Sequence, residues 1–85
     1  MFNLKNIIKH NNIITARVEP WTPKDKSFDI EVDIDKHTII KMSLDNDDIE
    51  VEMYANKARN KLCSLAEEAQ RTNTKTPLYA SVATH

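Results

Sequence analysis

Glycine is absent from the 85 residues of this chain, although average usage near 7% predicts about six. Without glycine, no glycine-rich loop can bring backbone amides close around a phosphate, so P-loop and dinucleotide-binding motifs are excluded. Turns and helix C-caps that need a left-handed residue must instead use Asn or Asp, which tolerate that conformation best. Such residues occur where turns are expected, at Asn11-Asn12, Asp35-Lys36, Asp45-Asn46-Asp47-Asp48 and Asn73.

Cysteine occurs once, as Cys63, so the chain cannot form an internal disulfide. Its first residues, MFNLKNIIK, lack the continuous apolar core of a signal peptide. No run approaches the roughly 18 apolar residues of a membrane span. We therefore expect a soluble protein of a reducing cytoplasm. The 8 Asn, 9 Ile and 9 Lys suggest the hypothesis of an AT-rich genome, such as that of a low-GC bacterium or its phage.

Neither sign of charge is in excess, because 12 basic and 13 acidic residues leave a net charge of −1. The chain as a whole therefore has no electrostatic reason to bind nucleic acid or an anionic membrane. The charges are nevertheless uneven along the chain. Residues 43–56 hold five acids and no base, whereas residues 57–85 hold five bases and two acids.

A chain of 85 residues is expected to form one small domain spanning residues 1–85. A domain of this size buries only about 60 to 65% of the surface of its unfolded chain. Association with a partner would add stability, so we expect a homo-oligomer, most simply a homodimer.

Three segments show the pattern of β-strands. Residues 13–19 are rich in β-branched side chains, and in residues 28–35 apolar and acidic side chains alternate strictly. After a tight turn at Asp35-Lys36, residues 38–44 predict the return strand of an antiparallel hairpin. The residues expected to face the core are Ile14, Ala16 and Val18; Phe28, Ile30, Val32 and Ile34; and Ile40, Met42 and Leu44.

A long amphipathic helix is expected over residues 51–71. Its start is ambiguous, because residues 49–54 also alternate as a fourth strand would. We favour the helix, since the stretch from Leu44 to Ile49 resembles a hydrophobic staple around an acidic cap. The apolar side of the helix consists of Val51, Tyr54, Ala55, Ala58, Leu62, Leu65, Ala66 and Ala69.

The two ends of the chain carry weaker signals. The apolar residues between Phe2 and Ile8 have the spacing of a short helix, which Asn11-Asn12 would end. A break at Thr76-Pro77 precedes residues 78–82, which fit a last short strand or a turn. The expected fold class is therefore α+β. It comprises a three-stranded, or four-stranded, antiparallel sheet with one long C-terminal amphipathic helix on one face and a short N-terminal helix.

The acids that alternate through residues 28–35 are the first candidate metal site. A calcium-binding loop also uses every second position, but one starting at Asp29 would need a glycine at Ile34 and a bidentate glutamate at Ile40. Alternate carboxylates on a strand also lie about 6.5 to 7 Å apart, which is too far for one ion. We interpret these acids as the solvent-facing side of a strand that protects a sheet edge.

The other reactive residues fit neither a metal site nor a catalytic one. No zinc-ligand spacing relates the histidines, which are His10, His37 and His85. Cys63 lies beside the apolar stripe, and Glu67 would raise its pKa, so we expect a partly buried structural thiol. The acids between Asp45 and Glu52 are expected to cap the helix rather than to form a catalytic pair. We therefore expect no enzyme, no cofactor and no small-molecule ligand.

Trp21 is the candidate partner-binding residue, together with Pro20 and Pro23, which restrict the loop around it. An exposed aromatic residue held in place is typical of protein-binding hot spots. Alternatively, the large indole folds over the end of the sheet as a lid. Both interpretations stay open.

The leading hypothesis is a small cytoplasmic protein with a regulatory or accessory role, which acts by protein–protein interaction as a homodimer. The alternative is a nucleic-acid-binding accessory protein that uses the basic side of the helix at Lys57, Arg59 and Lys61. Against that alternative, Glu67 can neutralise Arg71, and the acidic block precedes the same helix.

Overall fold

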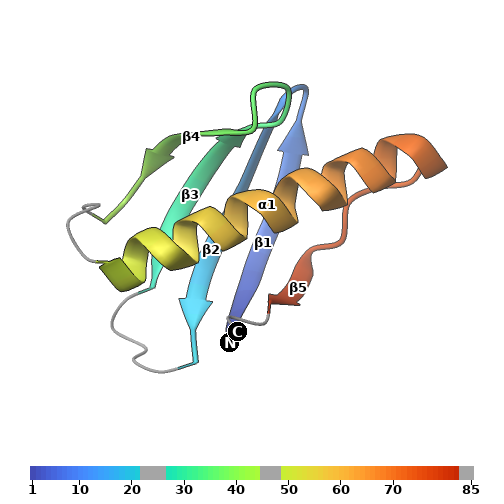
Figure 1. Cartoon of the computed structure of the whole chain (residues 1–85). Coiled ribbons are helices and arrows are strands. Elements are labelled where there is room, and N and C mark those ends of the chain that lie inside the picture. Colours follow the sequence, from blue (N-terminus) through green and yellow to red (C-terminus); the bar gives the residue numbers. More distant parts are fainter. Residues whose placement is uncertain (22–26, 45–48, 83–85) are drawn as a thin grey trace.

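The computed structural model describes residues 1–21, 27–44 and 49–82. The strands form one antiparallel sheet in the order β4-β3-β2-β1-β5, and the single described helix crosses one face of it (Figure 1). The fold class is therefore α+β, as expected, although the sheet has five strands rather than three or four. The elements are β1 (Phe2–His10), β2 (Ile13–Pro20), β3 (Phe28–Asp33), β4 (Thr38–Met42), α1 (Ile49–Thr72) and β5 (Tyr79–Val82).

The core lies between the sheet and α1, which contacts all five strands. On α1 the buried residues match the expected apolar side, except that Cys63 is also buried and Leu65 is only partly buried. The helix begins at Ile49, so the helical interpretation of residues 49–54 is confirmed. Ile49 is 82% exposed, so it does not form the expected staple with Leu44. The proposed acidic cap at Asp45 and Asp48 lies outside the described residues.

The expected N-terminal helix is wrong, because residues 2–10 form the strand β1. The pairing of β1 with β2 shifts register between Lys5 and Ile8, where Asn6 adopts a left-handed φ of 54°. This bulge adds a residue to the strand and turns Ile7 toward the core. The buried residues are therefore spaced unevenly along β1, and the uneven spacing resembled that of a helix.

A second bulge alters β4. Its pairing with β3 shifts register between Glu31 and Val32, so Ile39 and Met42 pack against the core. Ile40, which was expected to face the core, is half exposed. The turn before β4 is also longer than expected, and its left-handed residue is His37 rather than Asp35 or Lys36.

The C-terminal end of α1 is closed by Asn73, which has a φ of 55°. The Asn73 N–H donates to the Gln70 carbonyl, and the Thr74 N–H donates to the Ala69 carbonyl at 2.8 Å. These two bonds define a Schellman cap, in which Asn73 takes the place usually occupied by glycine. The chain then returns to the sheet as β5, which pairs with the first half of β1. Of the two possibilities for residues 78–82, the strand is therefore correct.

The face of the sheet opposite α1 is called the outer face below, and no described element packs on it. No helix in the described part of the chain is long and apolar enough to span a membrane.

Candidate interaction surface

The outer face combines charged, aromatic and aliphatic side chains. Alternation along each strand directs one set of side chains to α1 and the other set outward. The outward set consists of Asn3, Lys5 and Ile8 of β1; Ile13, Thr15, Arg17 and Glu19 of β2; Asp29, Glu31 and Asp33 of β3; Lys41 of β4; and Tyr79 and Ser81 of β5.

Trp21 lies at one end of this face, directly after β2. Its backbone N–H donates to the Met1 carbonyl at 3.1 Å, and its indole Nε1 donates to Asn3 Oδ1 at 3.0 Å. The side chain is nevertheless 49% exposed and is not part of the buried core. The indole is therefore held in one orientation while a large part of its surface stays open to solvent.

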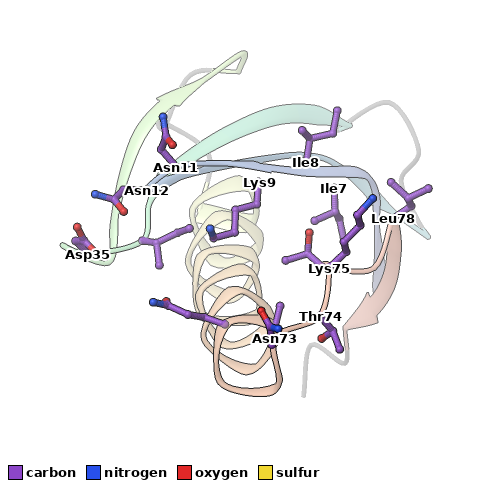
Figure 2. Close-up of a pocket in the computed structure, with 14 residues that line it drawn as sticks. Ile7, Ile8, Lys9, Asn11, Asn12, Asp35, Asn73, Thr74, Lys75 and Leu78 are labelled. Atoms are coloured by element: carbon purple, nitrogen blue, oxygen red, sulfur yellow. The ribbon is translucent and has the colours of Figure 1, made fainter.

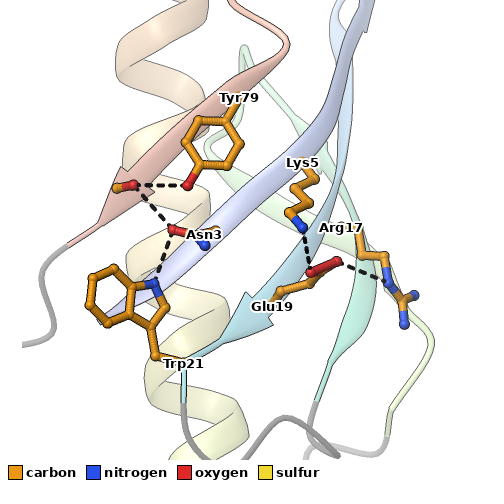
Figure 3. A network of polar contacts seen from close by, with 7 residues as sticks. Asn3, Lys5, Arg17, Glu19, Trp21 and Tyr79 are labelled. Carbon is orange, nitrogen blue, oxygen red and sulfur yellow. Dashed lines mark hydrogen bonds and ion pairs between the residues drawn. The ribbon is translucent and has the colours of Figure 1, made fainter.

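The acceptor of the indole is itself fixed by β5 (Figure 3). The Ser81 hydroxyl donates to the same Asn3 Oδ1 at 3.1 Å and lies 3.4 Å from the Tyr79 hydroxyl. Tyr79 is 51% exposed. Two half-exposed aromatic residues, Trp21 and Tyr79, are thus connected through Asn3 and Ser81.

A row of ion pairs crosses the outer face beside these aromatic residues. Lys5 Nζ lies 3.0 Å from Glu19 Oε1, and Arg17 Nε lies 3.8 Å from Glu19 Oε2. Arg17 Nη1 also donates to Asp29 Oδ1 at 3.3 Å. Exposed pairs of this kind each contribute only about 0 to 1 kcal/mol to stability. Their main effect is that acids and bases on this face neutralise one another.

The acidic side chains of β3 do lie on the solvent-facing side of the sheet, but β3 is not an edge strand. It lies between β2 and β4, so the expected role in edge protection is wrong. Across the strands, Asp29 is paired with Arg17 and Glu31 with Lys41. The residues that the structure describes contain no group of three side chains able to hold a metal ion.

A shallow hollow of about 450 Å³ lies beside Trp21. Pro20, one of the candidate residues, is buried at the end of β2, where it pairs with Phe2. Pro23 lies outside the described residues. The lining residues are Asn3, Lys5, Glu19, Pro20, Trp21 and Ser27.

The basic residues of the nucleic-acid alternative lie on α1 and do not form one patch. A helix rotates by about 100° per residue, so Lys57 and Lys61 share one flank, whereas Arg59 points roughly 200° away from Lys57. Arg59 instead donates hydrogen bonds to Asn60 Oδ1 at 3.3 and 3.2 Å. Only two of the three candidates can therefore contact the same ligand.

The reactive side chains are also dispersed. His10 ends β1, and His37 Nε2 lies 2.9 Å from Glu67 Oε1, which ties the turn before β4 to α1. His85 lies outside the described residues. Cys63 is buried. Burial raises the pKa of the Cys63 thiol, and Glu67 adds to this effect, so the thiol is packed rather than activated.

Asn3, Tyr79 and Ser81 belong to this surface but were not identified as candidates from the sequence. Their contacts join residues far apart in the chain, since Ser81 and Asn3 are separated by 78 positions. In the sequence, the apolar pattern at Leu78, Tyr79 and Val82 indicated only that this segment packs on the rest of the domain as a strand or a turn. It did not identify Tyr79 or Ser81 as part of a surface.

Comparison with known proteins assigns no family. The chain matches no family model, and no curated protein or solved structure is significantly similar to it.

Proposed function

We propose that this protein is a small, non-enzymatic interaction protein with a regulatory or accessory role, and that it self-associates through the outer face as a homodimer with Trp21 as an anchor. The observation that carries the proposal is the half-exposed indole held by Asn3 on a sheet face that no described element covers. An aromatic residue that is already fixed loses little conformational entropy on binding, which favours affinity.

The dimensions of the molecule suit such a dimer. Its principal extents are 36 × 21 × 21 Å, so one face offers on the order of 750 Å². A standard stable interface buries about 800 Å² on each partner. A dimer of standard size would therefore have to cover nearly the whole outer face.

The charge distribution of the outer face supports a second copy of this chain as the partner that binds there. β2 is the central strand, with β1 on one side and the acidic strand β3 on the other. A two-fold axis running along β2 would place β3 of one copy over β1 of its partner. Asp29, Arg17 and Lys5 share one level of the sheet, so Asp29 would face the partner's Lys5. The two-fold axis repeats this contact, so the interface would contain two Asp29–Lys5 contacts.

Light scattering on the size-exclusion peak, across a hundredfold range of concentration, tests the proposal. We expect the wild type to be a dimer and Trp21→Ala to dissociate it. Met53→Ala is the matched control, because Met53 is also an exposed apolar residue but lies on α1. A wild-type monomer at every concentration, or a Trp21→Ala dimer as stable as the wild type, would contradict the proposal.

A charge exchange tests the orientation. Asp29→Lys is expected to weaken the dimer by repelling the partner's Lys5, and the double variant Asp29→Lys with Lys5→Asp is expected to restore it. The control is the circular dichroism spectrum of each variant, which should match that of the wild type. Within one protomer the exchange places like charges beside Arg17 and Glu19, so urea denaturation of each variant is measured alongside. A double variant that is as stable as the wild type and still fails to dimerise would reject the two-fold axis along β2 while leaving the Trp21 test valid.

A further inference from the structure

A second surface lies on the other side of the sheet, at the end opposite Trp21. There the β1–β2 hairpin and the C-terminal end of α1 enclose an open groove of about 850 Å³ (Figure 2). Ile7, Ile34 and Ala69 are buried beneath it, whereas Leu78 is 72% exposed at its rim. The groove therefore has an apolar floor and the volume of a typical ligand site.

The wall of this groove includes a strand edge without a partner. β5 pairs with β1 only over Phe2–Lys5, and one further bond joins the Ile7 N–H to the Leu78 carbonyl at 3.2 Å. Among the described residues, no strand pairs with that side of β1 beyond Ile7.

Hairpin geometry identifies the backbone groups at this edge. The loop Asn11-Asn12 has two residues, so His10 and Ile13 form the hydrogen-bonded pair that closes it. Hydrogen bonding to a neighbouring strand alternates along an antiparallel strand. The N–H and C=O of Lys9 therefore point away from β2, to the same side as the Ile7 N–H, and face the groove.

The charge of the groove is positive. Lys9 extends from β1 toward the last turns of α1, and Lys75 stands on the other side of the opening (Figure 2). Neither ammonium forms an ion pair within the described part of the chain. Asp35 is the one acid among the described residues that line the groove.

We propose that this groove binds an extended acidic peptide, which adds to the free edge of β1 at Lys9 as a further strand. The backbone of the peptide pairs with the N–H and C=O of Lys9, as in other cases of strand addition to a sheet edge. One set of its alternate side chains points into the groove, toward Lys9, Lys75 and the apolar floor, and the other set points to the outer face beside Ile8. The groove shares Ile8 with the outer face, but it lies at the opposite end of the sheet from Trp21 and the proposal does not rest on the proposed dimer.

A pair of capped pentapeptides tests the site on the full chain. One alternates glutamate with valine, and the other has lysine in place of glutamate. With ¹⁵N-labelled protein, we expect the glutamate peptide alone to shift the amide resonances of Ile7, Lys9 and Asn11. Equal binding of both peptides, binding of neither, or shifts centred on Trp21 would overturn the proposal.

Two variants separate the charge from the backbone. Lys9→Glu is expected to lower the affinity for the glutamate peptide by at least about tenfold. Lys36→Glu makes the same change in a turn outside the groove and is expected to leave this affinity unchanged. Lys9→Pro removes the outward N–H, which an edge position tolerates, and should abolish binding while the circular dichroism spectrum is unchanged. If Lys9→Glu and Lys36→Glu weaken binding equally, the groove is not the site. If Lys9→Pro folds and still binds, the peptide is not an added strand.

Discussion

Asn6, Asn11, His37 and Asn73 hold the left-handed positions that many proteins give to glycine. Such a position costs most residues roughly 1 to 2 kcal/mol, because Cβ approaches the following carbonyl oxygen. Asn bears this cost best, since its short side chain can hydrogen-bond locally. The absence of glycine therefore leaves the fold intact but gives several single asparagines a conformational role.

Asn73 offers the clearest test of this role, because its cap is defined by two hydrogen bonds. We expect Asn73→Ala to lower the free energy of unfolding by about 1 kcal/mol, and Asn73→Gly to be at least as stable as the wild type. The control Ser64→Gly, in the middle of α1, should instead lose about 0.5 kcal/mol. Urea denaturation measures all three, and a loss on Asn73→Gly as large as on Asn73→Ala would contradict the role of the cap.

The reaction rate of the Cys63 thiol provides a test of its burial. Burial raises the pKa of the Cys63 thiol, the carboxylates of Glu67 and Asp33 raise it further, and Arg59 opposes them. At pH 8 the native protein therefore holds less thiolate than free cysteine does. We expect Ellman's reagent to react at least about a hundredfold more slowly with native than with denatured protein, since the thiol must first be exposed.

The same shift fixes the sign of a pH effect on stability. The pKa of the Cys63 thiol is higher in the folded than in the unfolded state. The thiol therefore makes its full contribution to the free energy of unfolding at a pH below the pKa of the unfolded state. This contribution is lost as the pH rises through the pKa of the folded state. Cys63→Ala should lack this alkaline decline in the free energy of unfolding. A decline equal to that of the wild type would show that other groups cause it.

At the scale of elements, alternation predicted β2 and β3 correctly because neither strand contains a bulge within its own run. It failed in β1 and misplaced Ile40 in β4, where an additional residue interrupts the period. Asn6 is the only local sign of the first bulge, and an asparagine is equally common in turns. Residues 2–10 form a strand because they pair with β2 and β5. A short stretch of sequence around β1 does not contain these partners, so its local pattern cannot reveal the pairing.

The helix α1 provides a prediction that sequence periodicity alone does not make. Leu62 and Leu65 both belong to its expected apolar side, but Leu62 is fully buried and Leu65 is only partly so. We expect Leu62→Ala to destabilise the protein by about 3 kcal/mol and Leu65→Ala by about 1 kcal/mol or less. Urea denaturation with an unchanged slope checks this ranking. Equal losses would mean that α1 is rotated relative to the sheet.

At the scale of the whole molecule, the sequence indicated one part of the candidate surface. Trp21 stood out because two prolines flank it, whereas the residues that hold it came from distant parts of the chain. Asn3 lies 18 positions away, and Tyr79 is brought alongside only by the pairing of β5 with β1. Tertiary pairing, rather than local pattern, therefore turns a loop tryptophan into part of a surface.

The nucleic-acid alternative is also tested at the scale of the whole molecule. Lys57 and Lys61 share one flank of α1, but Glu50 and Glu68 lie on the same flank two turns away. With a net charge of −1, the molecule offers few phosphate contacts, so we expect no strongly salt-dependent affinity for single-stranded or duplex DNA.

Fluorescence anisotropy with labelled oligonucleotides at low and high salt measures this directly. If binding did occur through α1, Lys57→Glu and Lys61→Glu would each weaken it and reduce its salt dependence, while Arg59→Glu, on the other flank, would not. Tight binding that falls steeply with salt and is lost in the two lysine variants would replace protein–protein interaction as the leading function. Absent or salt-insensitive binding removes nucleic acid as a partner, because phosphate contacts must release counterions.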